Sequence, residues 1–352
     1  MSFTICSDTP GTRQPSMKGQ AGFSLPELLI SVTVLLIISS AVTGALLQMT
    51  SSQSTIWNRT QLHAGVRSAT ELLQQEVGQA GRIALPGAVR LTAAVPAGAT
   101  TATLATTAVA PLTGVSGIFP GELLVIDPGS WNQATLASSE ETVVVSAVNQ
   151  ATNTITISRS IDATGTPYPG ASFRFAHLAN ATVRALGGFG SGIVPPSPGF
   201  VNGSDATHLK MYGDINGDGT LLFVEYICDT AAGKLYRNVM PFDQAPPKVA
   251  PTDSQVLLGS IQPNPGNTAC FTYMPNPLPV VGGTTYVLDV AITLTVNTEL
   301  KDTLTKQFQA ETKALLNVSP RNVFNVWQLA SAGMFSRVQP MPATVTALLP
   351  TP

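Results

Sequence analysis

The chain has 352 residues, of which 44% are hydrophobic and only 11% are charged, and its formal net charge is −2. A chain of this length and hydrophobic content can bury a sizeable core, which excludes an intrinsically disordered protein. The charge balance provides no basic surface for nucleic acid. Its 30 glycines and 27 prolines, with abundant Thr, Ala and Val, are typical of exported β proteins, in which turns interrupt short strands.

An uncharged apolar segment is the first predicted element. Residues 28–47 have the sequence LLISVTVLLIISSAVTGALL, twenty residues, which is about the length a helix needs to cross a bilayer. Arg13 and Lys18 precede this segment, and basic residues favour keeping the N-terminus in the cytoplasm. We therefore expect one membrane-spanning helix, with the long C-terminal part in the periplasm or outside the cell.

The residues that precede the span distinguish it from an ordinary secretory signal, whose cleavage site follows the apolar stretch. Residues 21–29, AGFSLPELL, resemble the cleavage and methylation motif of type IV prepilins. The resemblance implies that prepilin peptidase cuts between Gly22 and Phe23, that the new Phe23 amine is methylated, and that Glu27 is the fifth mature residue. The alternative is a plain signal anchor with Glu27 at the headgroup boundary.

Glu27 is a functional candidate on physical grounds as well, because a carboxylate at the head of an apolar helix is costly in lipid. In the pilin family the corresponding Glu is thought to pair with the N-terminal amine of a neighbouring subunit, and the resemblance transfers that role to Glu27 and Phe23. It also implies other pilin or pseudopilin subunits and the inner membrane as partners. Met17 is an alternative start to Met1 and would leave the short leader MKGQAG.

Beyond the span, the helix is expected to continue as an amphipathic stem. Apolar residues recur at three- and four-residue spacing at Leu62, Val66, Ala69, Leu73, Val77 and Ala80, with Arg59, Arg67, Glu71 and Glu76 elsewhere on the helical wheel. Gly78, Gly81 and Pro86 are expected to end the stem. The whole helix would run from about Pro26 to about Gly81.

After the stem, apolar and polar residues alternate between frequent turn signals, which predicts antiparallel β structure. Strands are expected at 122–127, 142–148, 154–158 and 172–176, forming a small β-barrel or sandwich inserted into the head. A hairpin is expected from 221–228 and 234–239, and another strand from 288–296. The predicted fold class is α+β: a long N-terminal spine helix, an antiparallel head and an additional small β insertion.

The expected organisation has five parts. They are a leader at 1–22, a spine helix at 23–82, an inserted β domain at 88–180, a pilin-like β head at 181–322, and a tail at 323–352 with a short apolar helix around 323–332. No catalytic serine turn, phosphate loop or dinucleotide motif occurs in a strand-turn-helix context, which predicts a structural protein and not an enzyme. The three histidines are far apart and predict no zinc or nucleophile site.

Motifs in the head narrow the resemblance. ELLQQEVGQAGR at the stem end, an acidic glycine-rich turn before Val-Glu-Tyr, a Lys-Leu-Tyr-Arg strand and a late Asn-Val-Ser-Pro-Arg-Asn together resemble minor pilins of the PilW and pseudopilin J kind. This implies a minor subunit that primes or caps a pilus. The alternatives are a type II secretion pseudopilin, or an adhesin-like minor pilin that binds a surface, a carbohydrate or DNA through the inserted domain. Because outermost tip subunits often lack the fifth-position Glu, Glu27 argues against that position.

A calcium site is a candidate in the head. Asp214, Asn216, Asp218, Thr220 and Glu225 fit the spacing of a calcium-binding loop, in which oxygen ligands converge around a glycine turn. The flanking residues are predicted strands and not helices, so a plain Asx turn without a metal is the alternative, and Glu225 is the weakest ligand. No other cofactor is expected.

The cysteine count predicts one disulfide. Cys6 precedes the span, whereas Cys228 and Cys270 lie in the part expected to be exported. An oxidising compartment favours a bond between Cys228 and Cys270. Two separate buried thiols are the alternative.

Overall fold

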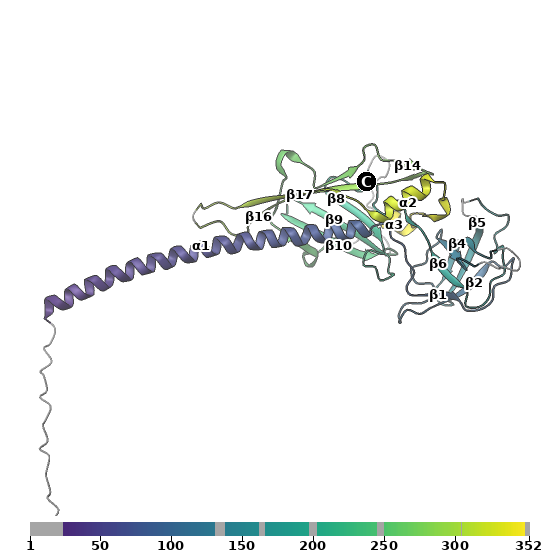
Figure 1. The fold of residues 1–352 in the computed structure, drawn as a ribbon, viewed down its shortest axis with the longest axis horizontal. Coiled ribbons are helices and arrows are strands. Elements are labelled where there is room, and N and C mark those ends of the chain that lie inside the picture. The colour runs from purple at the N-terminus through teal and green to yellow at the C-terminus, as the bar shows by residue number, and fades with distance from the viewer. Residues whose placement is uncertain are drawn as a thin grey trace, which may run out of the picture. The chain divides into compact units, whose positions relative to one another are not determined.

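The computed structural model describes residues 24–130, 138–161, 166–196, 203–244, 250–303 and 305–348. The chain divides into two compact units, residues 1–56 and residues 57–352. A single long helix, α1 (Leu25–Gln79), supplies the described part of the first unit and the beginning of the second (Figure 1). The predicted spine helix is therefore present, and it ends close to the expected glycines.

In the first unit, α1 presents apolar side chains on every side. Leu35 and Ile37 are 62% and 63% exposed, and none of the described residues of this unit is buried. The hydroxyls of this segment bond to the helix itself: Ser31 donates to the Glu27 carbonyl at 2.8 Å and Thr33 to the Leu29 carbonyl at 2.7 Å. Such local bonds satisfy polar groups that would be costly in lipid. In the described part of the chain, α1 is the helix with the length and composition to span a membrane.

In the second unit, the rest of α1 is amphipathic as predicted. Val66, Ala69, Leu73, Val77 and Ala80 are buried and belong to one hydrophobic cluster with the strands of the head. The residues recur every three or four positions, so they form one stripe along the helix. The stem therefore contributes a face to the core of the head.

Two sheets form the head around this stripe. One has the strand order β11-β10-β9-β8, with β8 (His208–Gly213), β9 (Leu222–Asp229), β10 (Lys234–Pro241) and β11 (Val256–Gly259). The other has the order β12-β16-β13, with β12 (Ile261–Gln262), β13 (Phe271–Met274) and β16 (Asp289–Asn297), and β17 (Ala310–Val318) also pairs with β16. The strand pairs of both sheets are antiparallel, and the predicted β9–β10 hairpin and the predicted strand at β16 are present.

A closed six-stranded barrel precedes these sheets in the chain. Its order is β1-β2-β5-β4-β3-β6, with β1 (Val89–Leu91), β2 (Thr101–Thr106), β3 (Leu123–Ile126), β4 (Glu141–Asn149), β5 (Thr154–Ile161) and β6 (Thr182–Ala185). Figure 1 shows the labelled strands β1, β2, β4, β5 and β6 close together, and their inward side chains belong to one hydrophobic cluster. Residues that alternate along β2, such as Ala102 and Leu104, point into that core. The expected α+β class with a small added β-barrel is confirmed.

The strand expected at 172–176 is wrong, and β1, β2 and β6 were not predicted. Residues 172–176 form no strand: Phe173 and Ala99 are joined by a backbone bond of 2.8 Å, and the amides of Arg174 and Phe175 donate to the Glu141 carboxylate. A side chain thus accepts the bonds that a neighbouring strand would otherwise accept. The barrel closes instead through β6, which lies beyond residue 180, and the division into domains stays a prediction.

Short elements complete the second unit. They are β7 (Gly188–Phe189) and β18 (Val338–Gln339), which pair in parallel, the hairpin β14 (Val280–Val281) and β15 (Thr284–Thr285), the helices α2 (Arg321–Ser331) and α3 (Ala343–Leu348), and 3-10 turns at Asp253–Gln255, Pro265–Asn267 and Phe335–Arg337. The apolar helix expected around 323–332 corresponds to α2. Val323 and Val326 of α2 pack on Tyr286.

Candidate functional site

The first candidate site is the start of α1. Gly22 and Phe23, the predicted cleavage and methylation residues, lie outside the described residues. Glu27 lies in the first helical turn and is exposed. A carboxylate in this turn interacts favourably with the unpaired amides at the helix N-terminus. The position leaves the carboxylate accessible to a partner from outside the chain.

The second candidate site is a buried ion pair where the stem meets the head. Glu76 is only 5% exposed, although it lies outside the apolar stripe that the sequence predicts. The phenol of Tyr226 on β9 donates to Glu76 Oε2 at 2.6 Å, and Arg237 Nε on β10 donates to Glu76 Oε1 at 3.0 Å. The register places Tyr226 directly opposite Arg237, so the two strands present both donors side by side.

The electrostatics of this pair follow from burial and from Glu76 itself. Burial raises the pKa of Tyr226, and the neighbouring Glu76 carboxylate raises it further, so the phenol stays a donor. Burial alone would lower the pKa of Arg237, but the hydrogen bonds and the charge of Glu76 outweigh it and raise that pKa. Glu76 therefore connects α1 to β9 through a hydrogen bond and to β10 through an ion pair. The sequence signal for it was weak: a lone acidic residue beside the apolar stripe.

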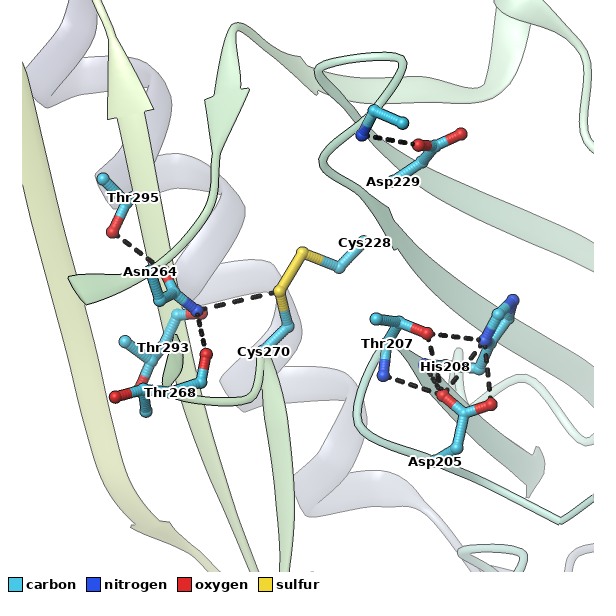
Figure 2. Close-up of a disulfide and its surroundings, with 11 residues drawn as sticks. Asp205, Thr207, His208, Cys228, Asp229, Asn264, Thr268, Cys270, Thr293 and Thr295 are labelled. Atoms are coloured by element: carbon cyan, nitrogen blue, oxygen red, sulfur yellow. Dashed lines mark hydrogen bonds and ion pairs between the residues drawn. A yellow bond between two sulfur atoms is a disulfide. The ribbon is translucent and has the colours of Figure 1, made fainter. Parts of the chain in front are cut away.

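The two cysteines of the head lie beside the stem. Cys228 at the end of β9 and Cys270 just before β13 form a disulfide, with Cα atoms 6.5 Å apart (Figure 2). The bond joins the two sheets of the head within the hydrophobic cluster that contains the stem stripe. Asn264 supports the Cys270 side: its amide donates to the carbonyls of Thr268 and Thr293 at 3.1 and 2.8 Å.

In the acidic turn predicted to bind calcium, backbone amides of the turn donate hydrogen bonds to the Asp214 carboxylate. Asp214 is fully buried, and its Oδ1 accepts the amides of Asp218 at 3.0 Å and Gly219 at 3.2 Å. Its other oxygen lies 3.3 Å from Arg82 Nε at the end of the stem. An Asx turn with a guanidinium as counter-charge needs no ion.

The other predicted calcium ligands are not gathered around Asp214. Glu225 lies on β9, where its carboxylate is 3.9 Å from Lys210 Nζ. Asp218 Oδ1 accepts the Thr220 amide at 2.8 Å, and Asn216 is exposed. Among the described residues, no group of three His, Cys, Asp or Glu side chains is arranged to hold a metal. This geometry favours the Asx turn over the calcium loop.

The barrel contains two buried carboxylates that the sequence did not reveal. Glu141 at the start of β4 accepts His177 Nε2 at 2.7 Å and Ser160 Oγ at 2.6 Å, in addition to two backbone amides. Burial would raise the pKa of Glu141, but these four donors outweigh it and lower the pKa. The hydrogen bonds to Glu141 thus attach the irregular segment 172–177 to the barrel.

The pKa of Glu122, the second buried carboxyl, shifts in the opposite direction from that of Glu141. It is fully buried just before β3, and its carboxylate accepts only the Phe119 amide, at 3.1 Å, within the described structure. Burial raises the pKa of Glu122 to about 8. The carboxyl is therefore largely protonated at neutral pH.

One cavity lies on the barrel. It has a volume of about 230 Å³, and its lining includes Glu140, Tyr168, Phe175 and Arg337. The guanidinium of Arg174 lies 3.8 Å from the centre of the Tyr168 ring. The combination of aromatic faces with both signs of charge is the kind of surface that can bind a small polar ligand.

Comparison with known proteins bears on the N-terminus. Residues 17–43 match the family model of the prokaryotic N-terminal methylation motif. No curated protein and no solved structure matches the chain. The matched residues include Gly22, Phe23 and Glu27 and most of the apolar segment, residues 28–43.

Proposed function

We infer that this type IV pilin-like chain is a structural subunit of a pilus or pseudopilus, and we propose that it is a minor one that primes or caps assembly. The observation that carries the proposal is the methylation motif at 17–43, continuous with a 55-residue helix whose first half is apolar on all sides. Such a helix suits anchoring in a membrane before assembly. A large head with an added barrel suits a rare subunit better than a closely packed major one.

The proposed processing follows from the motif. Prepilin peptidase would cut between Gly22 and Phe23, and the new Phe23 amine would be methylated. The head would lie in the periplasm until the helix leaves the bilayer for the filament. Glu27 would then pair with the Phe23 amine of a neighbouring subunit, since its carboxylate is exposed and needs a partner once water is removed.

N-terminal sequencing and mass measurement of membrane-extracted protein test this function. We expect a start at Phe23, with or without one methyl group. Gly22→Ala should leave an uncleaved precursor. A start at Met1 or Met17 in the mature protein, or normal processing of the variant, would contradict the proposal and favour a plain signal anchor.

A knockout separates pilus from pseudopilus. Loss of pili, twitching or DNA uptake with normal secretion is expected for the pilus subunit. A secretion defect with intact pili would instead assign the chain to a type II secretion system.

The cavity on the barrel favours adhesion as a second candidate function. Its aromatic and charged lining would contact a surface carbohydrate. Because β6 belongs to the barrel, deleting 88–180 would leave an incomplete barrel, so point variants are a cleaner test. Tyr168→Ala should abolish adhesion while piliation persists, with Arg90→Ala, on the exposed outside of β1, as the control. Unchanged adhesion would reject this candidate.

A further inference from the structure

Three polar side chains form a row across the sheet face that points away from the stem. Lys210 on β8 pairs directly with Glu225 on β9, and Glu225 pairs directly with Asn238 on β10. Directly opposed residues of antiparallel strands point to the same face. Tyr226, next to Glu225 along β9, points to the stem, so the row lies on the opposite face.

This row is buried. Lys210 is 3% exposed, Glu225 1% and Asn238 2%. The neighbouring row on the same face, Tyr212, Phe223 and Met240, belongs to an apolar cluster. An amine, a carboxyl and a carboxamide therefore share an environment with little water.

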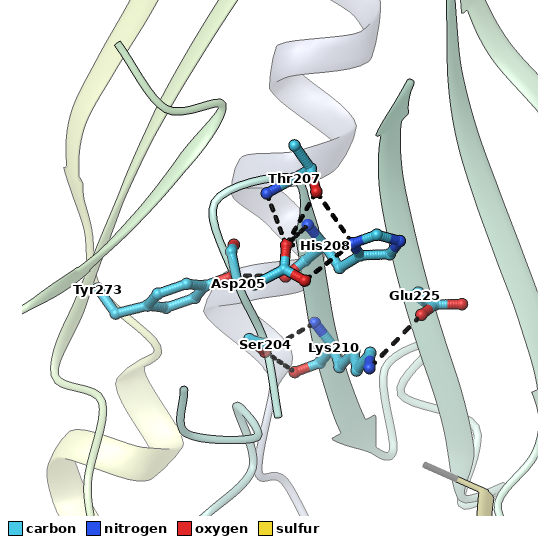
Figure 3. A network of polar contacts seen from close by, with 7 residues as sticks. All are labelled: Ser204, Asp205, Thr207, His208, Lys210, Glu225 and Tyr273. Carbon is cyan, nitrogen blue, oxygen red and sulfur yellow. Dashed lines mark hydrogen bonds and ion pairs between the residues drawn. The ribbon is translucent and has the colours of Figure 1, made fainter. Parts of the chain in front are cut away.

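The amine at one end of the row faces the carboxyl at its centre. Lys210 Nζ lies 3.9 Å from Glu225 Oε1 (Figure 3). On the other side of the row, Gln255 Nε2 donates to Asn238 Oδ1 at 2.9 Å. That bond orients the carboxamide and polarises its carbonyl.

We propose that Lys210 and Asn238 become joined by an intramolecular amide bond, with Glu225 as the acid–base group. The attack requires the unprotonated Lys210 amine, which forms when Lys210 passes one proton to the neighbouring Glu225 carboxylate. Nζ attacks Asn238 Cγ, the Nζ–Cγ bond forms, and the Cγ–Nδ2 bond breaks. Glu225 passes one proton from Nζ to Nδ2, which leaves as ammonia. No electrons are transferred and no co-reactant is consumed.

The geometry brings the reacting groups within reach. Adjacent strands are about 4.8 Å apart, so β8 and β10 are separated by about 9.6 Å. The four-carbon stem of lysine already carries Nζ to the Glu225 carboxylate of the intervening strand. Asn238 lies on the far strand, and the register places Glu225 of the middle strand directly opposite both Lys210 and Asn238. The product would tie β8 to β10 across β9, independently of the backbone ladder.

Mass spectrometry of the purified full chain, after reduction of the disulfide, tests the proposal. We expect an intact mass lower by one ammonia than the processed sequence requires. Trypsin should fail to cut after Lys210, and the peptide that begins at Asn238 should appear only as a branch on the peptide that contains Lys210. An unmodified mass, together with a peptide that ends at Lys210, would overturn the proposal and leave the row as a buried polar network.

Variants assign the roles. Lys210→Arg removes the nucleophile and Glu225→Gln removes the acid–base group, so each should restore the lost ammonia and the tryptic peptide that begins at Asn238. Lys234→Arg is the matched control, because that exposed lysine of β10 bonds to Asp253 and faces no carboxamide of the row. Loss of ammonia that persists in Lys210→Arg, or disappears in Lys234→Arg, would contradict the assignment.

Discussion

The two halves of α1 are parts of one helix, but their side chains differ in burial and in the groups that they contact. Before residue 57, none of the described side chains is buried, and the hydroxyls bond to the helix's own carbonyls. From residue 57 on, a stripe of small and branched residues is buried in the head, and Glu76 makes an ion pair with the sheet. The first half therefore leaves its apolar side chains available to lipid or to other subunits, whereas the second half packs on the strands of the head. Changes in each half should therefore affect different properties.

The largest expected effect on the stability of the head comes from removing the ion pair between Arg237 and Glu76. Arg237→Ala would leave the Glu76 carboxylate buried without its cation, which costs about 3–5 kcal/mol for such pairs. We expect the low end, since the side chain of Arg237 is 27% exposed. Urea unfolding of the full chain in detergent, followed by circular dichroism, measures the loss.

The control for that variant lies on the opposite side of the same helix. Arg67 pairs with Glu71 at 2.7 Å, but both side chains are exposed. Arg67→Ala should leave the unfolding midpoint nearly unchanged. Equal losses from the two arginine variants would show that burial of Glu76 contributes nothing.

A leucine from each half provides the second test. Leu73 is fully buried in the stem stripe, and Leu73→Ala should lower the free energy of unfolding by about 2–5 kcal/mol through the cavity that it leaves. Leu35→Ala removes the same atoms from an exposed position and should leave unfolding of the head unchanged. A comparable loss for Leu35→Ala would end the distinction between the halves.

The third test concerns pH and the barrel. Glu122 has a pKa of about 8 in the folded chain and an ordinary value of 4.5, so the folded state binds its proton more tightly. The resulting stability is fully present below pH 4.5 and is lost as pH rises through about 8, at up to about 1.4 kcal/mol per pH unit.

Glu122→Gln keeps an acceptor for the Phe119 amide but cannot ionise. Its unfolding midpoint should therefore depend less on pH than the wild-type midpoint, and the variant should be the more stable protein at pH 8. The midpoints at pH 5, 7 and 8 test this. Parallel pH profiles for the two proteins would mean that Glu122 does not ionise in this range.

The fourth test concerns the binding of calcium to the Asp214 turn. Because the turn amides and Arg82 already occupy the Asp214 carboxylate, we expect calorimetric titration with millimolar Ca²⁺ to give no heat. Heat that disappears in Asp218→Asn would restore the calcium loop. The same titration with Mg²⁺ is the control for non-specific binding.

The smallest expected effect on the head comes from Glu27→Ala. The side chain is exposed in the first turn of α1, so unfolding of the head should not change. Incorporation into filaments should nevertheless fall strongly, because the proposed pairing with the Phe23 amine would be lost. Sheared-pilus fractions measure incorporation, and wild-type amounts would reject the pairing.

The sequence by itself determined the spine helix and the class of the chain. Twenty uncharged residues, a motif before them and a stripe repeating every three or four residues are local patterns, and local patterns survive any tertiary arrangement. The β9–β10 hairpin was predictable for the same reason, since its strands and its turn are adjacent in the chain. These features needed no knowledge of distant partners.

Only the tertiary structure decided which polar residues are buried and what they meet. On the helical wheel Glu76 is an acidic residue beside the apolar stripe, and only the tertiary structure showed that Tyr226 of β9 and Arg237 of β10 bind it. The barrel closed through β6 because the amides of segment 172–177 bond to Glu141 and to distant loops. The row of Lys210, Glu225 and Asn238 exists only in the register of three strands. Each of these depends on contacts between residues far apart in sequence, which no local pattern records.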